Sequence, residues 1–107
     1  MSVRLPSGEL IPVLGRALVG RNPQARARES ADQLIALGNS DRSVSKTHAV
    51  LEASRGGIDV SDRGSTNGTL IVTAAGETLA CEPDVPVFAP VGSCIRVGSF
   101  ELRVERA

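Results

Sequence analysis

The apolar residues of this chain fall into short segments, many of them alternating with polar residues, and the segments are separated by Gly, Pro, Asn, Asp and Ser. Short segments with a period of two are typical of β-strands, and the residues between them are those that favour tight turns. We expect about ten strands, at residues 3–5, 9–13, 17–20, 33–37, 48–54, 58–61, 68–72, 78–81, 94–97 and 100–104. Strands at this regular spacing predict an all-β sandwich or barrel.

One segment, residues 23–37, has a composition that a helix could use, because it contains several alanines. Its apolar positions do not recur every 3.6 residues, as they would on an amphipathic helix. Its charged residues, which include Arg26, Arg28, Glu29 and Asp32, are typical of a solvated surface. We therefore expect a long exposed loop that leads into the strand at residues 33–37.

At 107 residues the chain has room for one hydrophobic core, so we expect a single domain over residues 1–107, with its core at about residues 3–104. The two ends are the best candidates for linkers, which predicts that the domain is part of a longer protein. Eleven of the 12 basic residues are Arg, and this bias, with the Ala, Gly and Val content, points to a bacterial source with a GC-rich genome.

The composition argues against several classes of function. Basic and acidic residues each number 12 and the only aromatic residues are Phe88 and Phe100, so we expect no nucleic-acid binding. Cys81 and Cys94 have neither CxxC spacing nor a neighbouring His, which argues against a metal, a redox site or another cofactor. His48 is the single histidine, and neither a catalytic Cys context nor a convincing Ser–His–acid set accompanies it, so we do not expect an enzyme.

The apolar segments are also too short to span a membrane, and the first residues lack the basic and apolar regions of a secretory signal. The sequence therefore predicts a cytoplasmic domain that does not itself insert into a membrane. Such a domain can also be the cytoplasmic part of a larger membrane-associated protein.

Four segments at strand ends, residues 20–21, 45–48, 62–69 and 92–98, are rich in turn residues, and the first three are also rich in hydrogen-bond donors. Within them, a guanidinium, an ammonium and hydroxyls are supplied by Arg21, Ser45, Lys46 and Thr66. A phosphate dianion carries three strongly accepting oxygens, and each charge-assisted hydrogen bond to it contributes about 1.5–3 kcal/mol. We infer that these loops can bind a phosphorylated group.

Each segment also has a structural interpretation when it is taken alone. Arg21 can be a solvated surface residue, and Asp62 can cap its own loop through its side chain. The Asn67-Gly68 dipeptide is common in tight turns and by itself indicates a hairpin. His48 stands at the start of a strand, where we expect a structural role. The order and co-occurrence of the segments carry the functional interpretation.

This combination resembles the forkhead-associated (FHA) domain family. The family pattern is Gly-Arg after an early strand, then Ser-x-x-His, then Asp-x-x-Ser-Thr-Asn-Gly-Thr, then Gly-x-x-Ile-x-[Val/Ile]-Gly. The corresponding residues here are Gly-Arg at 20–21, Ser-Lys-Thr-His at 45–48, Asp-Arg-Gly-Ser-Thr-Asn-Gly-Thr at 62–69 and Gly-Ser-Cys-Ile-Arg-Val-Gly at 92–98. The resemblance implies a two-sheet β-sandwich of the SMAD/FHA type, with about eleven mostly antiparallel strands, that binds phosphothreonine peptides through loops at one end.

The resemblance also implies a role for each motif residue. Arg21 and Ser45 contact the phosphate, and Thr66 lies in the same pocket. Lys46 approaches the phosphate or the peptide backbone, and Asn67 hydrogen-bonds the peptide main chain. The residues expected to structure the loops are Gly20, His48, Asp62, Ser65 and Gly68.

The implied function is a phosphothreonine-dependent interaction module whose partners are phosphorylated proteins in Ser/Thr kinase signalling. The alternative is an FHA-like scaffold or oligomerisation module that binds an unphosphorylated partner, although such members usually lack the Arg or the Ser that are present here. Ser43 stands where some relatives carry an Arg that reads an acidic peptide residue, so that preference is not expected. Residues 22–40 are a candidate specificity surface, with a mobile solvated loop as the alternative interpretation.

Overall fold

The structure is a computed structural model, and it describes residues 1–38 and 42–106. Eleven strands make up its regular secondary structure, and no helix occurs in the described residues. The strands are β1 (Ser2–Arg4), β2 (Leu10–Pro12), β3 (Arg16–Gly20), β4 (Gln33–Ala36), β5 (Ala49–Ser54), β6 (Gly57–Asp62), β7 (Thr69–Val72), β8 (Thr78–Cys81), β9 (Val87–Pro90), β10 (Cys94–Val97) and β11 (Phe100–Glu105).

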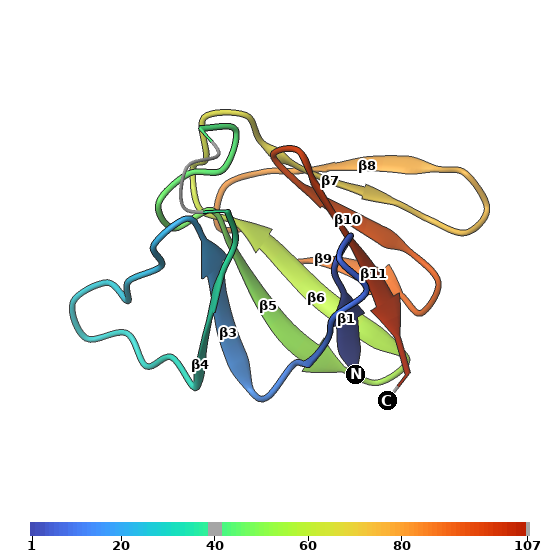
Figure 1. Ribbon diagram of the computed structural model, residues 1–107, viewed down its shortest axis with the longest axis horizontal. Helices are drawn as coiled ribbons and strands as arrows, with labels where there is room; N and C mark the ends of the chain where they lie inside the picture. The colour runs from blue at the N-terminus through green and yellow to red at the C-terminus, as the bar shows by residue number, and fades with distance from the viewer. Residues whose placement is uncertain (39–41, 107) are drawn as a thin grey trace.

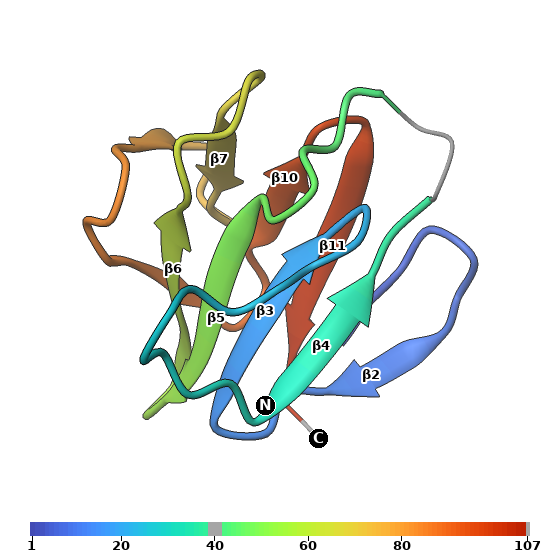
Figure 2. The same cartoon turned by 90° about the vertical axis from the view of Figure 1, so that its left-hand side faces the viewer.

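The strands form two sheets that pack against each other (Figures 1 and 2). The six-stranded sheet has the order β2-β1-β11-β10-β7-β8, and the five-stranded sheet has the order β4-β3-β5-β6-β9. Only β3 and β4 pair in parallel, and the other strand pairs are antiparallel. These findings confirm the predicted all-β sandwich of about eleven mostly antiparallel strands.

Strand alternation fills a single core between the sheets. Leu102 and Val104 of β11 are fully buried, whereas Glu101 and Arg103, which alternate with them, are exposed on the outer face. Burial of each such aliphatic side chain contributes about 1.5–3 kcal/mol to folding. The packed core makes the two sheets a firm support for the loops at their ends.

A parallel strand pair needs a crossover connection, and here it is residues 22–32, which we call the crossover segment. Figure 2 shows that it passes over the outer face of the five-stranded sheet, in front of β3 and β5. Leu18 and Val50, which pair with each other on that face, are 0% and 2% exposed although they do not belong to the central core. The crossover segment is therefore a cover for a second, smaller apolar layer, and not a loop that is solvated along its whole length.

One strand is absent from the sequence-based expectation. β9 lies at the edge of the five-stranded sheet and pairs with β6 alone. It ends in Pro90 and follows Pro86, and prolines within an apolar run argue against a strand unless that strand is at an edge. Edge position is decided by tertiary structure, so the residue pattern alone could not reveal it.

No helix in the described part of the chain is long and apolar enough to span a membrane.

Candidate functional site

Three loops gather at one end of the sandwich: the start of the crossover, the β4–β5 loop and the β6–β7 loop (Figure 1, upper left). Backbone hydrogen bonds join the first two, because Arg21 N donates to Ser45 O at 3.0 Å and Asn22 N donates to Lys46 O at 3.0 Å. The third loop is joined to the second by Thr66 N, which donates to Ser45 Oγ at 3.1 Å. The structure thus brings together donors of three segments that the sequence separates by up to about 45 positions.

Gly20, the last residue of β3, is required by this close approach. A Cβ atom on Gly20 would lie 2.1 Å from the carbonyl oxygen of Lys46. The β4–β5 loop therefore lies directly against the end of β3, where any side chain would displace it. The glycine is needed for space here, not for an unusual backbone angle.

Arg21 has its guanidinium oriented by the neighbouring loop. Its Nε atom donates to the carbonyl oxygen of Val44 at 3.0 Å. Among the described residues, neither terminal nitrogen of this guanidinium has a hydrogen-bond partner. The fork of Arg21 is thus fixed at its base and keeps its two terminal donor groups available for an anion.

Ser45 lies beside Arg21 and is held at two atoms. Its backbone N donates to His48 Nδ1 at 3.0 Å, and its Oγ accepts the hydrogen bond from Thr66 N. Because that contact uses a lone pair of Oγ, the hydroxyl hydrogen can still be donated to a ligand. Lys46, Thr66 and Asn67 are exposed around this pair.

His48 is completely buried and links all three loops. Its Nδ1 accepts from Ser45 N, so the ring hydrogen is on Nε2, which donates to Gly68 O at 2.8 Å. Its backbone N donates to Val19 O at 2.7 Å, and its carbonyl accepts from Arg63 N at 2.9 Å. These contacts leave neither ring nitrogen for a ligand and make His48 a structural brace.

Asp62, at the end of β6, is 3% exposed and organises the β6–β7 loop. Its carboxylate accepts from Ser65 N at 3.0 Å, from Ser65 Oγ at 2.5 Å and from Thr69 Oγ1 at 2.7 Å. β6 and β7 belong to different sheets, so the Asn67-Gly68 dipeptide lies in a connection between sheets and not in a hairpin. Gly68 has φ +78°, a backbone angle that favours glycine.

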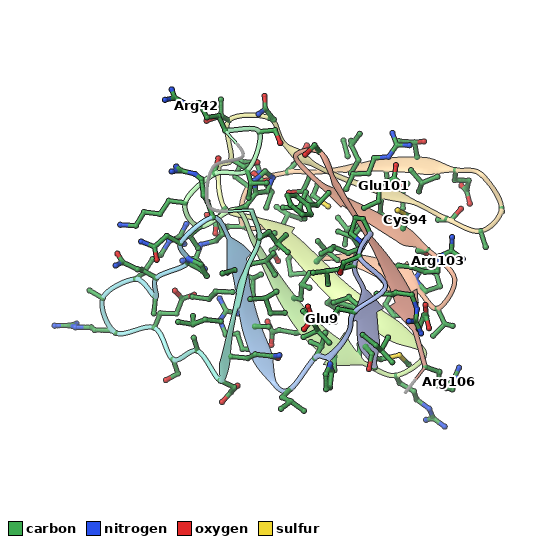
Figure 3. All side chains as sticks on the ribbon, viewed as in Figure 1. Glu9, Arg42, Cys94, Glu101, Arg103 and Arg106 are labelled. Atoms are coloured by element: carbon green, nitrogen blue, oxygen red, sulfur yellow. The ribbon has the colours of Figure 1, made fainter. Side chains whose placement is uncertain are left out.

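Ser43 joins this loop cluster to a fourth segment, a role that no sequence pattern indicated. Its carbonyl accepts from Asn67 Nδ2 at 3.0 Å, and its Oγ accepts from Ser99 N at 2.8 Å. Gly98, with φ +60°, would place a Cβ atom 2.5 Å from Ser43 O. The glycine that closes the motif at residues 92–98 therefore makes room for Ser43, and Arg42 extends from the loop at this same end of the molecule (Figure 3).

A hollow of about 480 Å³ lies on the outer face of the six-stranded sheet and extends to Ser99 in the β10–β11 turn. Cys94, Glu101 and Arg103 lie along it on β10 and β11 (Figure 3).

The two cysteines lie in different surroundings. Unlike Cys94, Cys81 is part of the core, and burial raises the pKa of its thiol to about 11. Burial also raises the pKa of the Cys94 thiol, so both cysteines are protonated at neutral pH. No group of His, Cys, Asp and Glu in the described residues is arranged to hold a metal ion.

Comparisons with known proteins identify a family and a shared fold. A family model for the FHA domain matches residues 17–98. No curated protein sequence matches the chain significantly.

Several solved structures share the fold. One, from a study of phosphothreonine-dependent FHA domain interactions, is 24% identical with a TM-score of 0.66, and the match covers 100% of this chain and 98% of that one. The FHA domain of human APLF, in complex with an XRCC1 bisphospho peptide, is 19% identical with a TM-score of 0.73, over 99% and 97% of the two chains. The MEK1 FHA domain in complex with a phosphothreonine peptide of HOP1 is 23% identical with a TM-score of 0.66, over 97% and 93%.

Proposed function

Because the chain belongs to the FHA domain family, we propose that it is a phosphothreonine-dependent protein–protein interaction module. The observation that carries the proposal is the pairing of two hydrogen-bond donor groups on adjacent loops. Arg21, anchored through Nε to Val44 O, and Ser45, whose backbone carbonyl accepts from Arg21 N, present a guanidinium fork and a hydroxyl at the same end of the sandwich. Both groups are half-buried, which limits competition from water.

The chemistry of the site fits a phosphate dianion. The guanidinium fork donates to two phosphate oxygens, and the Ser45 hydroxyl donates to another. Lys46 adds an exposed positive charge, and Thr66 adds a hydroxyl on the facing loop. Asn67 keeps its Oδ1 available to accept from a peptide N–H, since its Nδ2 is held by Ser43 O.

Two of the structurally similar FHA domains were solved with phosphorylated peptides, and this supports phosphothreonine as the ligand. A phosphothreonine differs from a phosphoserine by one methyl group. Its burial is worth about 1 kcal/mol, which corresponds to roughly fivefold discrimination. We propose partners that are substrates of Ser/Thr protein kinases.

The proposal assigns binding, and no catalytic step, to this domain. It also places the domain in the cytoplasm, where ATP-dependent kinases act, and within a longer protein whose other parts use the recruitment. The compact core at about residues 3–104 would then be the unit that carries the binding loops.

Titration of the chain with a phosphothreonine peptide library, with matched Thr and phosphoserine peptides, tests the proposal. We expect micromolar affinity for good phosphothreonine peptides, about −7 to −9 kcal/mol, and no measurable binding of the unphosphorylated forms. Arg21→Ala should weaken binding at least thirtyfold. The matched control is Arg55→Ala, in the β5–β6 turn at the opposite end of those strands, which should change affinity less than twofold. Equal binding with and without the phosphate would refute the proposal.

A further inference from the structure

Glu29 of the crossover segment pairs with two arginines beneath it, and we call this network the Glu29 clasp: Glu29, Arg16 and Arg63. Arg63 binds Glu29 with both terminal nitrogens, Nη1 to Oε2 at 2.7 Å and Nη2 to Oε1 at 2.8 Å. Arg16 Nη2 also donates to Oε2 at 2.8 Å, and Arg26 N donates to Oε1 at 2.8 Å. The carboxylate of Glu29 thus receives four hydrogen bonds from three residues.

The Arg63–Glu29 pair of the clasp is shielded from water to a degree that surface ion pairs are not, whereas the side chain of Arg16 is 36% exposed. The side chain of Arg63 is 3% exposed and that of Glu29 is 12% exposed. By contrast, the other ion pair of the crossover segment, Arg26 with Asp84, has side chains that are 56% and 57% exposed. A charge as buried as that of Arg63 is tolerated only while its partner is present, because removal of one partner leaves an uncompensated charge.

Arg63 is the first residue of the β6–β7 loop, three positions before Thr66. On its inner side the loop is held by two buried residues. The carboxylate of Asp62 accepts from Ser65 N, and the carbonyl oxygen of His48 accepts from Arg63 N. On the outside, only the Glu29 clasp holds the side chain of Arg63 among the described residues. The loop that carries Thr66 and Asn67 is therefore anchored from both faces of the sheet.

The same crossover segment also reaches the β4–β5 loop. Gln24 N donates to Thr47 Oγ1 at 3.0 Å, and Thr47 Oγ1 donates to Gln24 O at 3.3 Å. The segment starts directly after Arg21, so it connects the phosphate-binding arginine with both facing loops. Figure 2 shows it running along the face of the sheet between these points.

We propose that Glu29 is a positioning residue for phosphopeptide binding: it holds Arg63 and the crossover segment so that the three loops present their donors in one arrangement. This inference rests on the proposed function. Glu29 does not contact the peptide itself, because it lies on the outer face of the sheet and its carboxylate is occupied by arginines. Its effect on binding passes through Arg63 to the β6–β7 loop.

Isothermal titration of Glu29→Gln with the best phosphothreonine peptide, at a temperature where circular dichroism shows a folded domain, tests this role. We expect a loss of affinity of about tenfold or more. The matched controls are Asp84→Asn and Glu52→Gln, which remove the exposed partners of Arg26 and Arg16 and should stay within twofold of wild type. Amide hydrogen exchange at residues 64–67 should become faster in Glu29→Gln and stay unchanged in the controls.

If Glu29→Gln fails to fold, the double variant Glu29→Gln/Arg63→Gln carries the test, since it contains no unpaired buried charge. It should fold and still bind the phosphopeptide about tenfold more weakly. Wild-type affinity in either variant, with unchanged hydrogen exchange at residues 64–67, would overturn the inference. Binding by wild type that is lost in Arg21→Ala tests the proposed function separately, so the two failures are distinguishable.

Discussion

The buried ring of His48 is hydrogen-bonded through Nε2 to the carbonyl oxygen of Gly68 at 2.8 Å. Since the other ring nitrogen accepts from Ser45 N, this one imidazole joins the β4–β5 loop to the β6–β7 loop across the start of β5. The two loops carry most of the candidate binding residues. A residue with no ring nitrogen left for the ligand therefore helps to fix their relative position, together with the hydrogen bonds from Thr66 N to Ser45 Oγ and from Asn67 Nδ2 to Ser43 O.

Replacement of His48 by Ala is expected to destabilise the domain by about 2–4 kcal/mol, through the cavity and the unsatisfied Ser45 N–H and Gly68 C=O groups. Urea denaturation measures the loss. Lys46→Ala is the matched control on the neighbouring exposed surface, and its stability should change by about 0.5 kcal/mol or less. Equal stability of the two variants would contradict the bracing role of His48.

Replacement of Gly20 by Ala should separate the loops without a backbone strain at residue 20 itself. The new Cβ would meet Lys46 O at 2.1 Å, so the β4–β5 loop must move and phosphopeptide affinity should fall about tenfold. The control is Gly76→Ala in the β7–β8 turn, where φ is +90° and no atom lies within 4 Å of a Cβ. That variant should lose about 1 kcal/mol of stability but keep its affinity, as titration and thermal unfolding can both measure.

Acid should reveal the contribution of Glu29 to stability. Its hydrogen bonds to Arg63, opposed by burial, hold the pKa of Glu29 well below the ordinary value of 4.5. A carboxyl whose pKa is depressed by folding stabilises the folded state above its unfolded pKa, and this contribution declines as the pH falls through 4.5 toward the folded pKa. The difference in unfolding free energy between wild type and Glu29→Gln should therefore be constant from pH 7 to about 6 and shrink progressively below about pH 4.5. A difference that is independent of pH down to pH 3 would contradict the charged state of the clasp.

The residue pattern predicted the all-β architecture and located ten of the eleven strands, because alternation and turn residues act over a few neighbouring positions. It missed β9, whose prolines are acceptable only at a sheet edge. The candidate residues Arg21, Ser45 and Thr66 do gather at one end of the sandwich, linked through Ser45. Their contacts with phosphate remain a prediction.

The partners of those residues could not be read from the chain. Ser43 holds Asn67, and Glu29 holds Arg63, across 24 and 34 positions of sequence. No local pattern distinguishes these residues from other polar surface residues, since each gains its role from a segment that is distant along the chain. The crossover segment illustrates this. In the sequence its charged residues indicate only a solvated loop, and the structure shows that one of them, Glu29, pairs with the buried Arg63.

By itself the sequence determined most of the strands, the turns and the chemical types of the candidate binding residues, since these depend on side-chain periodicity, backbone preference and functional groups. Tertiary structure alone decided which strands share a sheet, how the crossover covers Leu18 and Val50, and which buried charges are paired. The physical reason is that burial and ion pairing depend on the distance between segments in space. The orientation of Arg21 is also of this second kind: the sequence already predicted Arg21 as a phosphate ligand, and its hydrogen bond to Val44 O decides how the guanidinium is presented.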